Sequence, residues 1–173
     1  MIVAPSEAGG IGASIAAFAA PWAKVYSHSK VLSAGTLFVH LAPLIAGGGV
    51  AFSADIATLR AFRRDASERT RQVAALAATH RLVLIGLTLS FISGILLFLS
   101  DVDTFLASIF LWIKLAFVAA LLVNGFVLTR VEAALARTPN DDVQWSRLRV
   151  VAMVSAFLWI ATTLAGVVLK EFA

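Results

Sequence analysis

Four long apolar runs constrain the fold of this chain more than any other feature. They cover residues 31–59, 82–99, 105–128 and 150–169, and an α-helix needs roughly 20 apolar residues to cross the hydrocarbon layer of a bilayer. Of the 173 residues, 60% are hydrophobic and only 14% are charged, which is more apolar surface than a soluble domain of this size can bury. The sequence therefore predicts an all-α integral membrane protein, a four-helix bundle surrounded by lipid bilayer.

Positive side chains gather in two of the three connections between these runs. The arginines of the first and third connections are Arg60, Arg63, Arg64, Arg69, Arg71, Arg81, Arg130, Arg137, Arg147 and Arg149. The second connection holds only Asp101 and Asp103. Because arginine-rich loops stay in the cytoplasm, we expect both termini to lie on the outer, periplasmic side. Arginines beside apolar runs anchor helices against anionic lipid, so the net charge of +4 does not indicate a nucleic-acid partner.

The first 30 residues differ from the rest. Their apolar stretch is short, is broken by Pro21, and ends near Trp22 and Tyr26, whose amphipathic rings settle at a membrane–water interface. We therefore expect residues 1–30 to form an N-terminal interfacial segment with a helix lying in the outer interface. Residues 31–173 are expected to form a single domain of four transmembrane helices.

Small side chains recur on the faces where these helices should pack. Gly86, Ser90 and Gly94 follow one another every four residues, and residues 47–49 are three consecutive glycines. Small residues at this spacing let membrane helices approach closely. In the fourth run a mildly polar stripe, formed by Ser155, Trp159, Thr162 and Gly166, should face the bundle.

Two ionisable residues lie where the bilayer should be. His40 is nine residues into the first run, and Lys114 is nine residues past Phe105, about 13 Å along a helix. Ionisable groups inside a membrane are costly and are by default candidates for function. Both fall in the outer half of the membrane, so they could meet. The alternatives are that His40 only hydrogen-bonds between helices, to Ser93 or Thr162, and that the third helix starts near residue 107 or 108 and leaves Lys114 at the interface.

Two further residues join the candidate set. His80 enters the second run at the cytoplasmic boundary, where it is either a ligand or an ordinary interface residue. A single haem bridging His40 and His80 would require that helix to begin deeper in the membrane. Asn124 is the other strong polar group in the third run. The chain has no cysteine, so its three histidines are the nitrogen ligands available to a metal.

Three segments resemble a broad group of small bacterial membrane proteins, the copper-resistance D-type proteins and the small membrane protoporphyrinogen oxidase family. The segments are FVHLAPLIAGGGVAFSAD, RLVLIGLTLSFISGILLF and FLWIKLAFVAALLVNG. The matching elements are His40 seven residues before a glycine pair, Gly94 before LLF, and Trp112 two residues before Lys114.

This resemblance implies a haem- or porphyrin-binding helical bundle in a bacterial inner membrane, with His40 and Lys114 at functional positions. We therefore expect the chain to bind a tetrapyrrole, b-type haem in particular, and to serve electron transfer or porphyrin oxidation. His40 would be the axial ligand to the metal or a base, Lys114 the partner of a carboxylate or reacting centre, and Arg81 a contact for a propionate. His80 and Asn124 would lie at the same cofactor.

Two other functions remain open. The chain could be a non-catalytic accessory subunit of a larger membrane complex, or a homo-oligomer, with His40 joining helices. It could instead handle copper, although Met1 and Met153 are its only soft ligands.

Overall fold

The computed structural model describes residues 7–172, except for the side chains of residues 7–9, 11, 170 and 172. Its helices are α1 (Glu7–His28), α2 (Lys30–Ala61), α3 (Ala66–Phe98), α4 (Val102–Ala107), α5 (Ile109–Arg137) and α6 (Asp142–Phe172). Between residues 7 and 172 there is no strand. Residues 1–6 of the predicted N-terminal segment, and Ala173, lie outside the described residues.

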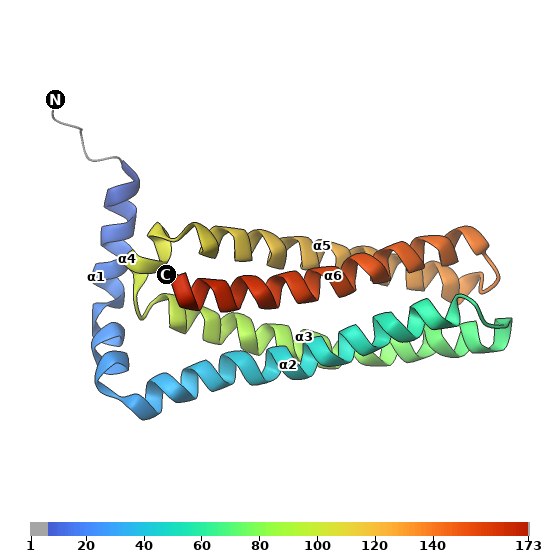
Figure 1. Cartoon of the computed structure of the whole chain (residues 1–173), viewed down its shortest axis with the longest axis horizontal. Helices are drawn as coiled ribbons and strands as arrows, with labels where there is room; N and C mark the ends of the chain where they lie inside the picture. The colour runs from blue at the N-terminus through green and yellow to red at the C-terminus, as the bar shows by residue number, and fades with distance from the viewer. Residues whose placement is uncertain (1–6, 173) are drawn as a thin grey trace.

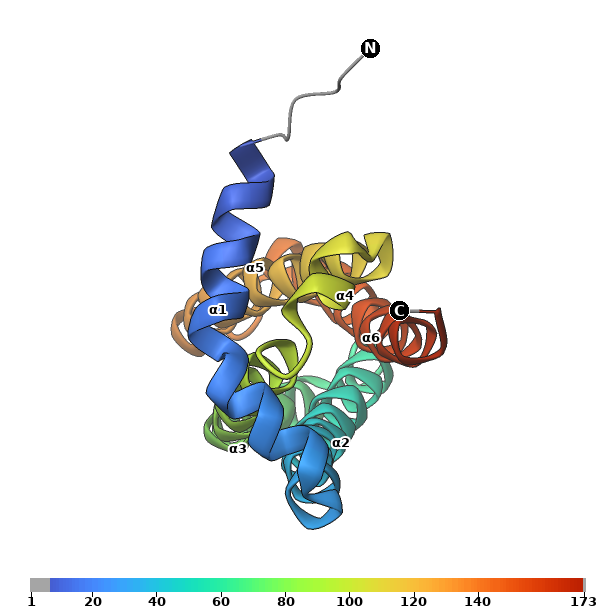
Figure 2. The same cartoon turned by 90° about the vertical axis from the view of Figure 1, so that its left-hand side faces the viewer.

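Four of these helices run side by side and form a bundle (Figures 1 and 2). They are α2, α3, α5 and α6, and within the described range they are the helices long and apolar enough to cross a membrane. Many of their large apolar side chains are exposed on the outside of the bundle, where a bilayer would cover them. The prediction of an all-α, membrane-spanning four-helix bundle is confirmed.

The bundle is built from two hairpins, α2 with α3 and α5 with α6. Glycines explain the close approach in the first hairpin, because a Cβ atom on Gly86 would lie 2.7 Å from the Pro43 carbonyl oxygen. The hairpins are joined mainly where α2 meets α6, and α3 and α5 make far fewer contacts. There a Cβ atom on Gly48 would lie 2.8 Å from the ring of Trp159. The predicted packing faces are therefore confirmed on α3 and α6 and, for Gly47 and Gly48, on α2. Gly49 is exposed, and an added Cβ there would have nothing within 4 Å.

The other two helices cover the end of the bundle that carries both described chain ends. The α1 helix runs across this end, not along the bundle, and α4 lies beside it (Figures 1 and 2). The indole N–H of Trp22 donates a hydrogen bond to the Leu96 carbonyl at 2.8 Å and so ties α1 to the end of α3. A helix across the bundle end has the orientation expected of an interfacial helix.

The third apolar run is not one helix. Its first residues belong to α4, and Ser108 takes an extended conformation before α5 begins at Ile109. The predicted start of the third spanning helix at Phe105 is therefore wrong, and the alternative start near residue 108 is the correct one. Lys114 consequently lies only five residues into α5, about 8 Å along its axis.

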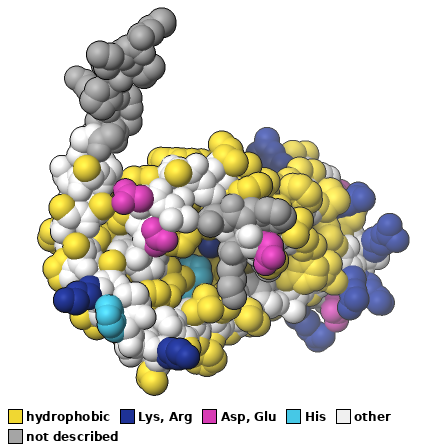
Figure 3. Space-filling view, turned by 60° about the vertical axis from the view of Figure 1, so that its left-hand side comes forward, with side chains coloured by type: hydrophobic (Ala, Val, Ile, Leu, Met, Phe, Trp, Pro, Cys, Tyr) yellow, Lys and Arg dark blue, Asp and Glu magenta, His cyan; other side chains and the backbone are white. Residues whose placement is uncertain are grey.

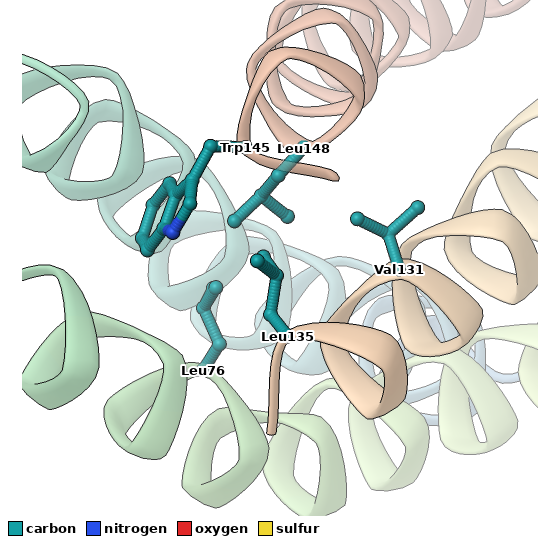
Figure 4. Close-up of a cluster of buried hydrophobic side chains, with 5 residues drawn as sticks. All are labelled: Leu76, Val131, Leu135, Trp145 and Leu148. Atoms are coloured by element: carbon teal, nitrogen blue, oxygen red, sulfur yellow. The ribbon is translucent and has the colours of Figure 1, made fainter. Parts of the chain in front are cut away.

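The opposite end of the bundle has a tightly packed core. Five side chains from α3, α5 and α6 meet there and are at most 7% exposed: Leu76, Val131, Leu135, Trp145 and Leu148 (Figure 4).

Asp65 caps the start of α3 by accepting a hydrogen bond from the Glu68 amide, and this contact holds the pKa of Asp65 below its usual range. The helices thus extend past the apolar runs into both arginine-rich connections, where they pack as they would in a soluble protein.

Candidate functional site

Polar side chains lie inside the bundle at two levels. The outer level, nearer α1 and α4, contains His40 and Lys114. The inner level, nearer the arginine-rich connections, contains Asp55, His80 and Glu132.

The outer level is organised by a hydrogen bond between α2 and α3. His40 Nδ1 lies 2.8 Å from the Ser90 carbonyl oxygen. Because a carbonyl oxygen only accepts hydrogen bonds, Nδ1 carries the proton and donates, and the Nε2 nitrogen keeps its lone pair. The hydroxyl oxygens of Ser90 and Ser93 lie further from Nδ1, each at 3.4 Å. A bond between helices thus exists on α3, but its closest acceptor is the Ser90 carbonyl and not the predicted Ser93 or Thr162. It leaves Nε2 without a hydrogen-bond partner among residues 7–172.

Lys114 occupies the same level on the other hairpin. Its side chain is half-buried and lies against α6, where a Cβ atom on Gly166 would be 3.6 Å from Nζ. Lys114 and His40 are close enough for their charges to interact. No described carboxylate forms an ion pair with Lys114, so its Nζ is available to an anionic group. The structure therefore brings together the two residues that the sequence singled out.

Glycines on the neighbouring helices make room for the side chains of this pair. A Cβ atom on Gly94 would lie 3.1 Å from the His40 ring, so any larger residue there would push against the imidazole. Figure 3 shows histidine surface at the bottom of a recess on this end of the molecule, with a small area of Lys or Arg surface beside it. The same view shows most other basic side chains gathered at the opposite end. The outer level is thus accessible from outside the bundle.

The inner level is organised by an ion pair between α3 and α5. His80 Nε2 lies 2.7 Å from Glu132 Oε2, and the two side chains are 28% and 8% exposed. The other carboxyl oxygen of Glu132, Oε1, is buried without a hydrogen-bond partner in the described part of the chain. His80 is therefore engaged by the carboxyl group of Glu132, and this contact joins α3 to α5.

Asp55 is the third member of the inner level. Its side chain is only 2% exposed, and its carboxyl group contacts the Ser155 hydroxyl of α6. The Oδ2 oxygen has no hydrogen-bond partner within the described residues. Asp55 therefore lies inside the bundle, close enough to Glu132 for their charges to repel.

A cavity of about 360 Å³ adjoins the inner level. Its polar lining residues are Asp55, Thr79, His80, Thr129 and Ser155, and the rest of its lining is mainly apolar side chains of α3, α5 and α6. This volume is in the range of roughly 300–1,000 Å³ that small-molecule sites occupy. The inner level therefore combines buried ionisable groups with room for a ligand.

The remaining predicted site residues lie away from the outer level. Arg81 is exposed and follows His80 on α3. Asn124 donates its side-chain amide to the Val151 carbonyl at 3.2 Å and so joins α5 to α6. His80 is ten residues before Ser90, about 15 Å along α3, so one haem iron cannot take both His40 and His80 as ligands. Across residues 7–172 no three His, Asp or Glu side chains form a group that could hold a metal ion.

Glu132 was not among the predicted site residues because residues 129–149 were expected to form a connection. In the structure α5 continues to Arg137, so Glu132 still lies within the bundle. One signal was available. Glu132 stands between Val131 and Ala133 in a stretch whose apolar residues keep helical spacing, and such a lone acid needs a partner if it faces inward.

No protein-family model, curated protein or solved structure matches this chain. The functional assignment of both levels therefore rests on their own geometry.

Proposed function

We propose that this integral membrane protein binds a tetrapyrrole, b-type haem in particular, at the outer level and serves a redox function, either electron transfer or porphyrin oxidation. The observation that carries the proposal is the hydrogen bond from His40 Nδ1 to the Ser90 carbonyl. Histidines that ligate metals commonly donate their second ring nitrogen to a backbone carbonyl, which fixes the tautomer and directs the other lone pair to the metal.

The residues of the outer level fit such a group chemically. His40 Nε2 offers the neutral lone pair that an axial ligand requires, and in porphyrin oxidation the same nitrogen could accept a proton. Lys114 offers a cation that has no carboxylate partner within the described residues, which suits a propionate. A bound haem would supply a one-electron couple at its iron.

The geometry changes the expected roles of three residues. Arg81 is exposed at the level of His80, so we assign the propionate contact to Lys114. His80 is paired with Glu132 and Asn124 joins α5 to α6, so neither belongs to the proposed cofactor site. Among the described residues, His40 would therefore hold the haem iron and Lys114 would contact a propionate.

We also propose that the membrane is a bacterial inner membrane and that both termini face the periplasm. The distribution of arginines supports this orientation, because they gather at the end of the bundle opposite α1 and α4. The outer level then opens toward the periplasmic side.

The proposal is tested by the visible spectrum of the protein purified in mild detergent, oxidised and reduced, with haem supplied during expression. We expect a Soret band that is lost or shifted in His40→Ala and unchanged in His28→Ala, which removes an exposed histidine from α1. A colourless wild-type protein, or identical spectra for wild type and His40→Ala, contradicts the proposal.

A further inference from the structure

We propose that the inner cavity binds a lipid-soluble molecule carrying a hydroxyl group, which enters from the bilayer between α3 and α5. This site is separate from the proposed tetrapyrrole site, since it lies in the other half of the bundle and shares no residue with it.

The entrance of the cavity is formed by apolar residues on the outer surface of the bundle. Three apolar residues that line the cavity, Leu84, Leu122 and Phe126, are also 54–61% exposed on the outer surface of the bundle. They lie on α3 and α5, the neighbouring helices with few contacts between them. The cavity therefore opens sideways, toward lipid, and its entrance is apolar. A molecule that uses this route must be soluble in the hydrocarbon layer.

The cavity also has a polar part, at Asp55. Asp55 Oδ2 is buried, lacks a hydrogen-bond partner in the described part of the chain, and belongs to a residue that lines the cavity. A buried polar atom without a partner costs about 1–3 kcal/mol, so a ligand that supplies the missing bond gains affinity. The Ser155 hydroxyl, which also lines the cavity, interacts with the same carboxyl group.

The chemistry of Asp55 indicates which functional group the ligand should carry. A hydroxyl can donate a hydrogen bond to a carboxyl oxygen, so it supplies the bond that Asp55 Oδ2 lacks. An ammonium group also donates, but a charged ligand would have to cross the apolar entrance. Trp159 lines the cavity as well, and an aromatic ring can pack against its indole. A phenol with an alkyl chain therefore meets every requirement of the site.

Radiolabelled 4-decylphenol is the probe, and 4-decylanisole is its matched partner because it cannot donate a hydrogen bond. Binding is measured on the full chain in lipid nanodiscs, with empty nanodiscs as the blank. We expect one saturable site per chain and roughly tenfold tighter binding of the phenol, the equivalent of one hydrogen bond. In Asp55→Ala the two probes should bind equally.

A second variant blocks the cavity without removing a polar group. Gly125 lines the cavity and has open space where a side chain would go, so Gly125→Leu should fill the cavity and abolish saturable binding. Gly49 has equal space but lies outside this cavity, so Gly49→Leu should bind normally. Both variants must elute as monodisperse, helical protein.

Three results overturn the proposal: no saturable binding above the blank, equal affinity of wild type for the two probes, and undiminished binding in Gly125→Leu. The outcome is independent of the tetrapyrrole. We expect His40→Ala to bind 4-decylphenol normally, and a colourless protein that binds the phenol would refute only the proposed function.

Discussion

His80 and Glu132 form a 2.7 Å contact that joins α3 to α5, neighbouring helices that otherwise touch little. The carboxyl group of Glu132 is nearly buried, and its second oxygen has no hydrogen-bond partner within residues 7–172. The imidazole is thus the one described group that compensates this carboxylate. We infer that the pair stabilises the side of the bundle where the cavity opens.

Removing either partner should therefore destabilise the protein. We expect His80→Ala and Glu132→Ala each to lower the free energy of unfolding by about 1.5–3 kcal/mol, the range for hydrogen bonds to charged groups. The double variant should cost less than the sum of the two, because the second substitution removes a group that the first left unpaired. The measurement is unfolding in mixed SDS–detergent micelles, followed by circular dichroism.

The exposed pair of Arg71 and Glu68 serves as the control for this cycle. Its side chains are 78% and 50% exposed at a separation of 3.2 Å, so its coupling should be about 0–1 kcal/mol. Strict additivity of the His80 and Glu132 substitutions would show that their contact contributes nothing to stability.

The approach of α2 to α3 should be sensitive to a single methyl group. A Cβ atom at position 86 would lie 2.7 Å from the Pro43 carbonyl oxygen, which is backbone and cannot rotate away. We expect Gly86→Ala to cost about 1–3 kcal/mol in the same unfolding assay, as overpacking of a filled core does. Gly49→Ala, with nothing within 4 Å of the added Cβ, should be neutral or slightly stabilising. Equal stability of the two variants would contradict the close contact.

Arg69 should be far more important to stability than its neighbour Arg71. Its guanidinium carbon lies 5.7 Å from the Phe62 ring centroid and 5.4 Å from that of Trp145, and Nη2 donates to the Phe62 carbonyl at 2.9 Å. Lysine cannot reproduce this planar stacking and fork of donors. We expect Arg69→Lys to lower the free energy of unfolding by about 1–2 kcal/mol.

The corresponding substitution of Arg71 should change stability by less than about 0.5 kcal/mol, because that side chain is mostly exposed. If both lysine variants unfold alike, the stacking of Arg69 on the core of the arginine-rich end contributes little.

Much of the fold was predictable from the sequence because a bilayer leaves few options. Four apolar runs must form helices, and glycines at helical spacing mark where these helices touch. That Gly86 lies at a helix contact, and that the stripe on α6 that includes Trp159 faces inward, followed from spacing alone. The meeting of His40 with Lys114 could be anticipated because both lie at similar depth in the outer half.

The inner level could not be predicted in the same way. Hydropathy locates the part of a helix that lipid covers, but α3 begins sixteen residues before its apolar run and α5 continues nine residues beyond its own. Those extensions contain His80 and Glu132, whose side chains meet inside the bundle. Similarly, the short helix α4 takes the first residues of the third run, which brings Lys114 closer to the end of the bundle.

Chemical rescue tests the proposed role of His40 most directly. His40→Ala is purified from cells supplied with haem, and its oxidised and reduced spectra are recorded with and without imidazole. If His40 is the axial ligand, the variant should lose or shift the Soret band, and imidazole should restore the wild-type spectrum by filling the vacated position. If wild type binds no haem, or if the spectra of wild type and variant agree before imidazole is added, His40 is not a haem ligand.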